Sequence, residues 1–302
     1  MAPPAVSGPL VVVLGPTASG KSDVAMAAAR AVAGTEIVAV DAMQVYRGMD
    51  IGTAKPSPAD RRAVPHHGLD LVEPHCDFTV AEYRRAFDAS VATVAGHVLL
   101  VAGTGLYLSA VVDRLEMPGQ WPEVRAELEA IPTDVLWGRL TDVDPLAASR
   151  IEPGNRRRVL RALEVTLGGG RPFSSYGPGL QAYPPTDAVL IGLRWPRAVL
   201  AERIERRVQA MMAAGLLEEV AGLAVGGMSR TARQALGYKE LLAHLDGDVT
   251  LDEAVATIVL RTRQFAVRQE RWFRRDPRVR WFDVDRDPVA EVAPAVVDAL
   301  HA

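Results

Sequence analysis

Cysteine is nearly absent from this 302-residue chain, in which Cys76 stands alone. A single cysteine excludes a disulfide framework within the chain and a zinc site built from cysteines. The pair His66-His67 has no other histidine or cysteine at ligand spacing, so we expect structural hydrogen bonds there rather than a metal. Nothing close to Cys76 in the sequence marks it as a nucleophile.

Long apolar runs and a strong net charge are also absent. No stretch approaches the roughly 18–20 apolar residues that a membrane helix needs. The N-terminal MAPPAVSGP has no charged segment followed by an apolar one, so we expect no signal peptide. The formal net charge of −3 gives no overall sign of nucleic-acid binding. We expect a cytoplasmic protein without membrane contact.

The first pattern along the chain is an alternation of predicted strands and helices. Short apolar runs predict buried strands at Leu10–Leu14, Glu36–Val40 and His97–Val101, and helices are predicted at Ser22–Val32 and Thr79–Val94. This alternation is typical of an α/β domain with a parallel sheet.

The alternation stops in the middle of the chain and then resumes. Residues 116–183 carry short helical segments, many prolines and a glycine-rich loop at 168–179, with no buried strand. Further strands are predicted at 187–193 and 280–283, and helices at 197–214, 232–244 and 251–275. We therefore predict a core of residues 1–115 and 184–302 that is interrupted by a helical insertion of residues 116–183.

The stretch LGPTASGKSD carries GxxxxGKS between a predicted strand and a predicted helix, the context of a phosphate-binding P-loop. Its glycines let backbone N–H groups point inward, and Lys21 and the helix N-terminus add positive charge. The Ser22 hydroxyl is a candidate ligand for Mg²⁺. We predict a polyphosphate site made by Gly15, Pro16, Thr17, Ala18, Ser19, Gly20, Lys21 and Ser22.

A catalytic acid of the kind that ATPases and kinases use is missing from the third predicted strand. That strand runs into the uncharged glycine-rich turn 103–105 rather than into Asp or Glu. The acid that follows a strand beside the P-loop is Asp41. Because open α/β sheets bind ligands at the carboxyl ends of their strands, we favour a functional role for Asp41 over a helix cap or turn.

The predicted helix at 197–214 places arginine beside its buried side. Its apolar stripe is Leu200, Ile204, Val208 and Met211. Arg207 borders this stripe, and Arg203 lies one turn earlier. An inward-facing arginine needs an anion, and the spacing leaves a carboxylate and a ligand phosphate equally open.

Two segments concentrate positive charge. Asn155–Arg161 holds four arginines, and Arg261–Arg275 holds six, interleaved with Phe265, Trp272 and Phe273. Arginine with aromatic residues suits phosphate contact and base stacking. Each segment alone is typical of a solvated helix face, but two such segments in one P-loop protein favour RNA binding.

Together these segments resemble the bacterial tRNA dimethylallyltransferase family. The resemblance covers nearly the whole chain, and its most specific motif is DAMQVYRGMDIGTAKP at 41–56. The other matching stretches are GPTASGKS (15–22), GTGLYL (103–108), RRVLRALEV (157–165), RIERRV (203–208), ARQALGYKEL (232–241) and TRQFAVRQERWFR (262–274). The resemblance implies a P-loop NTPase-like parallel sheet flanked by helices, with an all-helical insertion domain.

The resemblance also implies an activity, in which a dimethylallyl group passes from dimethylallyl diphosphate to N6 of the adenosine 3′-adjacent to the anticodon. The implied catalytic residues are Asp41, Thr17 and Arg207, with Asp41 as proton acceptor and Arg207 on the leaving group. The P-loop then holds the donor's diphosphate with Mg²⁺ at Ser22, and ATP is not the substrate. The implied partner is the tRNA anticodon stem-loop, and we expect a monomer.

The tRNA contacts that the resemblance implies lie in both predicted domains. They are Asp41, Ala42, Met43, Gln44, Thr104, Arg125, Arg157, Arg158, Val159, Leu160, Arg161, Arg233, Gly237 and Tyr238. The chain departs from the family pattern in having Ala42 where serine is common and Ala102 before the Gly103 turn. The region 125–144 is also a few residues short.

Two other functions are compatible with a P-loop. A small-molecule enzyme, either a kinase or an isopentenyltransferase acting on free adenine nucleotides, would need neither the basic segments nor the insertion. A non-enzymatic RNA-binding ATPase would need a hydrolytic acid, for which the sequence offers no candidate.

Overall fold

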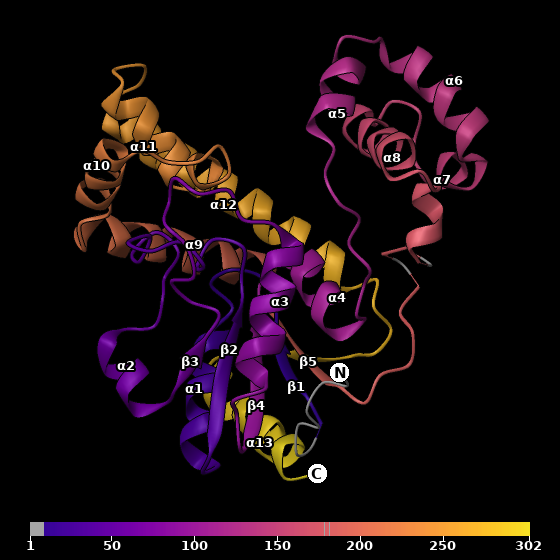
Figure 1. The fold of residues 1–302 in the computed structure, drawn as a ribbon. Coiled ribbons are helices and arrows are strands. Elements are labelled where there is room, and N and C mark those ends of the chain that lie inside the picture. Colours follow the sequence, from indigo (N-terminus) through magenta and orange to yellow (C-terminus); the bar gives the residue numbers. More distant parts are fainter. Residues whose placement is uncertain (1–8, 178, 181) are drawn as a thin grey trace. The chain divides into compact units, whose positions relative to one another are not determined.

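The computed structural model describes residues 9–177, 179–180 and 182–302 (Figure 1). The chain forms two compact units: one holds the chain up to Val112 and again from Pro185 onward, and the other is Asp113–Pro184. The domain boundaries expected at 115/116 and 183/184 lie a few residues away. The expectation for the N-terminal MAPPAVSGP falls almost wholly outside the described residues, as does Pro178 of the glycine-rich loop.

The first unit is built on a parallel sheet. Within the described residues its strand order is β3-β2-β4-β1-β5-β6. The strands are β1 Val11–Leu14, β2 Thr35–Val40, β3 His66–His67, β4 His97–Ala102, β5 Val189–Arg194 and β6 Val279–Asp283. All paired strands run parallel. The central strands are buried on both faces, as their unbroken apolar runs predict.

Helices cover both faces of this sheet. The chain moves one way across the sheet from β1 to β2 and the other way from β2 to β4, so right-handed crossovers place their helices on opposite faces. Helix α1 (Lys21–Ala31) packs against α13 (Pro288–His301), and α3 (Val80–Val91) packs against α4 (Gly105–Val112) (Figure 1). A capping box of Thr79 and Glu82 starts α3.

The remaining elements of this unit are mostly helical. They are α2 Pro58–Ala63, α9 Arg197–Ala213, α10 Leu216–Gly226, η2 Ala232–Gln234, α11 Tyr238–Leu245 and α12 Leu251–Phe273. In the described residues no single helix is long and apolar enough to span a bilayer. The pair α9 and α10 reaches that length and composition together but is bent by 64°.

The second unit is a small helical domain with its own apolar core. It contains α5 Pro122–Glu129, α6 Thr133–Val143, α7 Pro145–Arg150, α8 Arg156–Gly169 and η1 Phe173–Tyr176. Its fully buried side chains include Leu136, Leu140 and Leu163, which come from two helices that are apolar along one side. The described residues of this unit contain no strand, in agreement with the predicted all-helical insertion.

Several local predictions are wrong. The single helix expected at 232–244 is a 3₁₀ turn and a separate α11, because Ala235, with a ψ of 140°, and Gly237, with a φ of +91°, lie outside helical geometry. Gly168 and Gly169 belong to α8 rather than to a loop. Helices α2, α4, α10 and α13 and the short strand β3 were not predicted, although α2 and α13 each begin with a capping residue followed by proline, Ser57-Pro58 and Asp287-Pro288.

Candidate active site

Three loops start at the same level along the carboxyl edge of the sheet. Leu14 of β1 is in register with Ala102 of β4, and Ala102 is in register with Val40 of β2. The residues that follow these three adjacent strands are therefore the start of the P-loop after β1, Gly103 after β4 and Asp41 after β2. Strand spacing of about 4.8 Å brings these segments together.

The P-loop has the backbone geometry of an anion-binding nest. Ala18 and Gly20 have φ values of +62° and +89°, which turn successive N–H groups toward one side. Two features require glycine at position 20: the positive φ, and the contact with Pro288, whose Cγ would lie 2.6 Å from a Cβ there. Helix α1 follows at Lys21, so its N-terminus adds positive potential.

Side chains from later in the sequence hold this loop in place. The Nε1–H of Trp195 donates to the carbonyl of Ser19 at 2.9 Å, and Nε of Arg203 donates to the carbonyl of Ala18 at 2.8 Å. The Arg203 guanidinium also stacks on the Trp195 ring at 4.3 Å. Arg203, one of the two inward-facing arginines of α9, therefore stabilises the P-loop.

The other inward arginine, Arg207, is different. It is half-buried in a pocket that it shares with Lys21, and in the part of the chain that the structure describes no acidic side chain forms an ion pair with it. Burial lowers the pKa of Arg207, while the charges of Asp41 and Asp23 act in the opposite direction. The geometry therefore favours a ligand anion over a carboxylate partner for Arg207.

Lys21 has an altered acidity in this setting. Burial, and then the charge of Arg207, lower the pKa of Lys21 to about 8. Its ammonium makes only a long 3.4 Å hydrogen bond, to the Pro16 carbonyl. Two cations that repel each other, and that form no ion pair within the described residues, make a site that a diphosphate would relax.

Asp41 presents one carboxylate oxygen to the backbone and leaves the other free. Oδ1 accepts hydrogen bonds from the N–H groups of Met43 at 2.8 Å and Gln44 at 3.3 Å. Oδ2 lies beside the Gly103 turn, where a Cβ would be 3.3 Å away from it. The adjacent Ala42 N–H donates to Oγ1 of Thr104 at 3.3 Å. Asp41 is thus oriented by its own loop, with Oδ2 available as a base.

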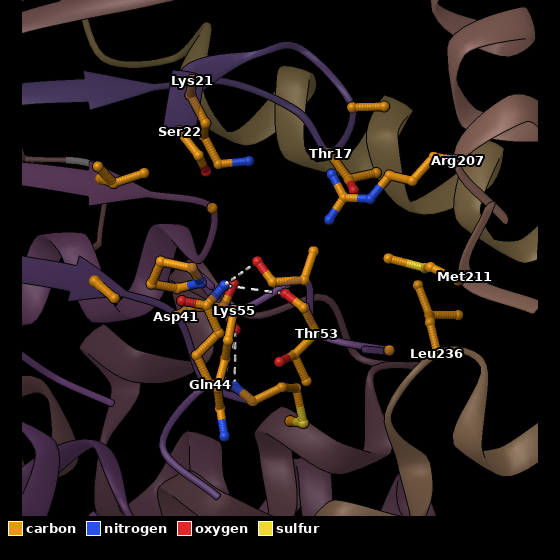
Figure 2. Close-up of a pocket in the computed structure, with 18 of the residues that line it drawn as sticks. Thr17, Lys21, Ser22, Asp41, Gln44, Thr53, Lys55, Arg207, Met211 and Leu236 are labelled. Carbon is orange, nitrogen blue, oxygen red and sulfur yellow. Dashed lines mark hydrogen bonds between the residues drawn. The ribbon is translucent and has the colours of Figure 1, made fainter. Parts of the chain in front are cut away.

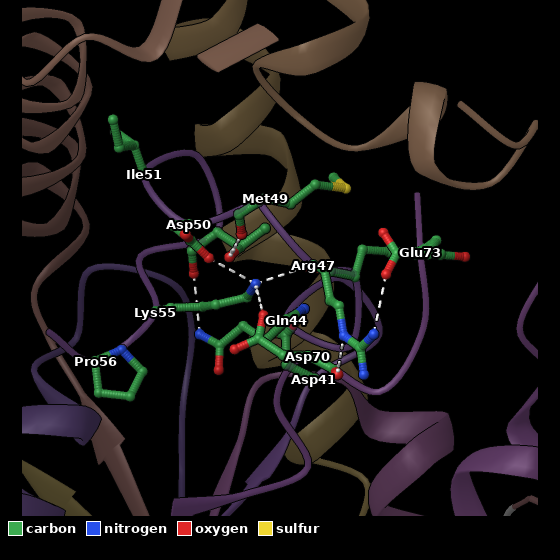
Figure 3. A network of polar contacts seen from close by, with 12 residues as sticks. Asp41, Gln44, Arg47, Met49, Asp50, Ile51, Lys55, Pro56, Asp70 and Glu73 are labelled. Atoms are coloured by element: carbon green, nitrogen blue, oxygen red, sulfur yellow. Dashed lines mark hydrogen bonds and ion pairs between the residues drawn. The ribbon is translucent and has the colours of Figure 1, made fainter. Parts of the chain in front are cut away.

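The motif at 41–56 folds back on itself around Lys55 (Figure 3). The Lys55 side chain is 1% exposed, and its Nζ bonds Asp50 Oδ1 at 2.7 Å, Asp70 Oδ1 at 2.6 Å and the Tyr46 carbonyl at 2.6 Å. The Gln44 amide donates to the Thr53 carbonyl at 3.0 Å. These contacts to buried Lys55 shape the loop that carries Asp41.

A pocket of about 1370 Å³ joins these groups. Figure 2 shows Lys21, Ser22, Thr17 and Arg207 along one part of it, with Asp41 and Gln44 across from them. Met211 and Leu236 add apolar surface beside Arg207. The pocket thus combines the cations Lys21 and Arg207 with a carboxylate and an apolar wall. The other lining residues named from sequence are Ala18, Gly20, Ala42, Met43, Thr104 and Gly237.

Residues predicted to contact RNA divide into two groups. Arg157, Arg158 and Arg233 are exposed and carry no ion pair among the described residues. By contrast, Arg125 and Arg161 both bind the buried carboxylate of Glu164, and Arg161 also donates to the carbonyls of Pro118 and Gly119. These two arginines hold the helical unit together.

Several residues that the resemblance assigns to RNA contact are buried. Val159 is fully buried and Leu160 is 4% exposed in the core of the second unit, because they lie on the apolar side of α8. Tyr238 is also fully buried, and its hydroxyl donates to Glu219 at 2.5 Å. Their side chains leave no surface for RNA.

Metal-binding side chains are scarce. No group of three or more His, Cys, Asp or Glu side chains in the described residues could hold a metal ion. His66 Nδ1 lies 2.8 Å from the Val64 carbonyl, and His67 Nε2 lies 2.5 Å from Glu36 Oε2. The pair therefore makes structural hydrogen bonds, as expected.

Sequence reasoning missed two residues that build the site. Gln269 is 6% exposed in α12 and bonds both the P-loop and the Gly103 turn. Its signal was a polar residue within the buried stripe of Ala254, Ile258, Ala266 and Phe273. Glu219 accepts from the N–H groups of residues 50–52 and fixes that loop; no sequence pattern marks it.

Comparison with known proteins places this geometry in a family. The family model for IPP transferase matches residues 44–276, and that for isopentenyl transferase matches residues 9–66. The tRNA dimethylallyltransferase of Kineococcus radiotolerans is 47% identical over 97% of this chain and 96% of its own length.

Solved structures agree with this assignment. The tRNA isopentenylpyrophosphate transferase of Bacillus halodurans has a TM-score of 0.70 and 35% identity over 98% of this chain and 97% of its own. A eukaryotic dimethylallyltransferase that acts on tRNA shares the fold, with a TM-score of 0.81 at 23% identity, over 96% of this chain and 78% of its own. The Kineococcus radiotolerans relative is 47% identical over nearly its full length, and the IPP transferase model covers most of the chain. The protein therefore belongs to the IPP transferase family.

Proposed function

We propose that this protein is a tRNA dimethylallyltransferase, which moves a dimethylallyl group from dimethylallyl diphosphate to N6 of the adenosine 3′-adjacent to the anticodon. Its relatives over nearly the full length carry that activity in their names. The observation that carries the proposal at the site is the pair of cations, Lys21 and Arg207, in one pocket with Asp41, whose Oδ2 accepts no hydrogen bond from the described residues.

The donor's diphosphate fits the P-loop side of this pocket. The N–H groups of the nest, the Lys21 ammonium and the Arg207 guanidinium would bind the two phosphates and stabilise them as negative charge develops on the leaving group. Met211 and Leu236 would contact the dimethylallyl chain. The free hydroxyl of Thr17, which also lines the pocket, would donate to the diphosphate.

The residues present also fit a magnesium ion, which the family implies. Ser22 is exposed at the first turn of α1, lines the pocket and has no hydrogen-bond partner for its hydroxyl among the described residues. A protein usually binds Mg²⁺ through one or two side chains together with substrate phosphates. Mg²⁺ held between Ser22 and the diphosphate would neutralise charge on the leaving group.

Asp41 supplies the base. The exocyclic amine of adenine is a poor nucleophile, because its lone pair is delocalised into the ring. As the amine nitrogen bonds the allylic carbon and the carbon–oxygen bond to diphosphate breaks, Oδ2 of Asp41 takes the amine proton. A base positioned in this way contributes typically about 10²–10⁴-fold to the rate.

The acceptor would be a tRNA anticodon stem-loop. An adenine must leave its stack to enter the pocket, which costs a few kcal/mol and least in a single-stranded loop. Exposed Arg157 and Arg158 of the helical unit and Arg233 of the core are free to bind phosphates. Because the pocket is complete within one chain, we propose a monomer, and the tRNA substrate would place it in the cytoplasm.

Labelled dimethylallyl diphosphate distinguishes this function from its alternatives. The protein is incubated with the donor, Mg²⁺ and unmodified tRNA, and in parallel with AMP or ATP. We expect label in tRNA, at the adenosine next to the anticodon. Label in free nucleotides instead, or ATP turnover without prenyl transfer, would refute the proposal in favour of a nucleotide-acting enzyme or an ATPase.

A further inference from the structure

A buried glutamine connects the two halves of the candidate site. Oε1 of Gln269 accepts a hydrogen bond from the Thr17 N–H at 2.8 Å, and its Nε2 donates to the Gly103 carbonyl at 2.7 Å. Gln269 is 6% exposed and comes from α12, more than 150 residues beyond either partner. One side-chain amide therefore ties the P-loop to the turn after β4.

A second residue of α12 fixes the same turn. The indole of Trp272 packs directly on Gly105: a Cβ at Gly105 would lie 2.1 Å from its Nε1. Gln269 and Trp272 are three residues apart, so they lie on the same face of α12. The turn is thus held at Gly103 by a hydrogen bond and at Gly105 by contact.

This turn is also in contact with the catalytic groups. Oγ1 of Thr104 accepts the Ala42 N–H, next to Asp41. A Cβ on Gly103 would lie 3.3 Å from Asp41 Oδ2, 3.4 Å from Gln269 Nε2 and 3.5 Å from Lys21 Cε. The carboxylate, the amide and the lysine all approach one point, which only a glycine leaves open.

An amide is the side chain that these partners require. The Thr17 N–H needs an acceptor and the Gly103 carbonyl needs a donor, and an amide offers both. An apolar residue at 269 would leave the buried Gly103 carbonyl unpaired, and the half-buried Thr17 N–H would lose its partner. The interaction also joins two segments that follow different strands, the P-loop after β1 and the turn after β4.

We propose that Gln269 is a positioning residue that sets the distance between the diphosphate cradle and Asp41. The amide fixes the P-loop at Thr17 and the Asp41 side of the site through the 103–105 turn. This inference rests on the proposed function, because the distance matters only if a donor bound at the P-loop reacts with an amine held at Asp41. A displacement of about 1 Å in such geometry can lower a rate by about 10²-fold.

The test compares three variants of the full chain in the prenyl-transfer assay. Gln269→Leu removes both hydrogen bonds, and Gln269→Glu keeps the shape and the acceptor for Thr17. Gln264→Leu changes an exposed glutamine of the same helix and is the control. Circular dichroism at the assay temperature measures the folded fraction of each variant, so that lost activity is counted per folded molecule.

We expect Gln269→Leu to lower kcat by about 10- to 100-fold, with smaller changes in KM for donor and for tRNA. Gln269→Glu should recover part of this loss as the pH falls. Protonation of the glutamate restores the donor to the Gly103 carbonyl, and burial, the neighbouring Asp41 and the cations Lys21 and Arg207 determine where it occurs. Gln264→Leu should match the unaltered protein.

Three results would overturn the proposal. They are an unchanged kcat in Gln269→Leu, a loss confined to KM for the donor, and a loss that vanishes once the folded fraction is counted. A failure of the proposed function looks different, because the unaltered protein would then transfer no label to tRNA.

Discussion

Lys21 and Arg207 face the same pocket, and neither forms an ion pair with an acidic side chain in the described parts of the chain. After burial, the charge of Arg207 is the next largest cause that lowers the pKa of Lys21 to about 8. The unliganded site therefore holds two cations at an energetic cost, which an anionic ligand removes.

Donor binding should depend on pH through Lys21. Below pH 8 Lys21 is charged before binding, whereas above pH 8 the binding of diphosphate must also protonate it. We expect affinity for inorganic diphosphate to fall as the pH rises above about 8, with proton uptake on binding. Isothermal titration in buffers of different ionisation enthalpy measures both. In Lys21→Met the proton uptake should disappear; if it persists, another group is responsible.

Arg207→Ala should remove much of the stabilisation of the leaving group. Loss of one such donor typically costs about 10²–10³-fold in rate, and we expect kcat/KM for the donor to fall by that amount. Arg197→Ala, which removes an exposed arginine at the start of the same helix, is the control and should behave as the unaltered protein. Equal activity of the two variants would show that Arg207 does not contact the donor.

Asp41→Asn should separate catalysis from binding. An amide oxygen can still accept the N–H groups of Met43 and Gln44, so the loop should keep its shape, but the base is lost. We expect kcat to fall by about 10²–10⁴-fold while affinity for tRNA, measured by filter binding, changes little. Asp298→Asn on the exposed side of α13 is the control. Weakened tRNA binding with normal turnover would contradict the assigned role.

Substitutions of arginines in the helical unit should have two different effects. Arg157→Ala combined with Arg158→Ala should weaken tRNA binding and reduce its salt dependence, by about one ion for each phosphate that the variant no longer binds. Arg161→Ala should instead destabilise the unit, by about 1–3 kcal/mol, because it removes one of two arginines that pair with buried Glu164. Salt titrations and thermal unfolding distinguish the two. The opposite assignment of effects would refute the division.

A methyl group should have opposite effects at two glycines. Gly105→Ala would force the new Cβ into Trp272, and such overpacking typically costs about 1–3 kcal/mol of stability. Gly222 is exposed on α10 and a Cβ there would have no atom within 4 Å, so Gly222→Ala should stabilise by about 0.5–1 kcal/mol through helix propensity. Urea unfolding measures both changes. Equal effects would show that the Trp272 contact does not restrain Gly105.

Much of the site could be read from local patterns. The P-loop needs glycines and a lysine at fixed spacing, and an apolar run before it predicts the strand that ends there. Asp41 follows a second such run, and parallel strands bring their carboxyl ends to one edge, so its proximity to the P-loop follows from sequence. The boundaries of the helical insertion also follow, because the alternation of strands and helices stops there.

Other features depended on contacts between distant segments. The sequence placed Arg203 and Arg207 alike beside the apolar side of α9. Only the folded chain shows that Arg203 bonds a carbonyl and that Arg207 forms no ion pair with an acid among the described residues. Tyr238 lies in a motif that implied RNA contact, yet its ring is buried against Gly52. Burial and pairing are properties of three-dimensional neighbours, which residue spacing does not encode.

The sequence by itself determined that a GxxxxGKS loop follows β1, that a carboxylate stands at the same sheet edge and that a helical insertion interrupts the core. Those properties come from backbone geometry and hydrophobic periodicity, which act over a few residues. The tertiary structure decided which cation stays free for a ligand and which glutamine spans the P-loop and the Gly103 turn. Those choices arise because α9 and α12 pack across the carboxyl edge of the sheet and bring side chains to loops far away in the chain.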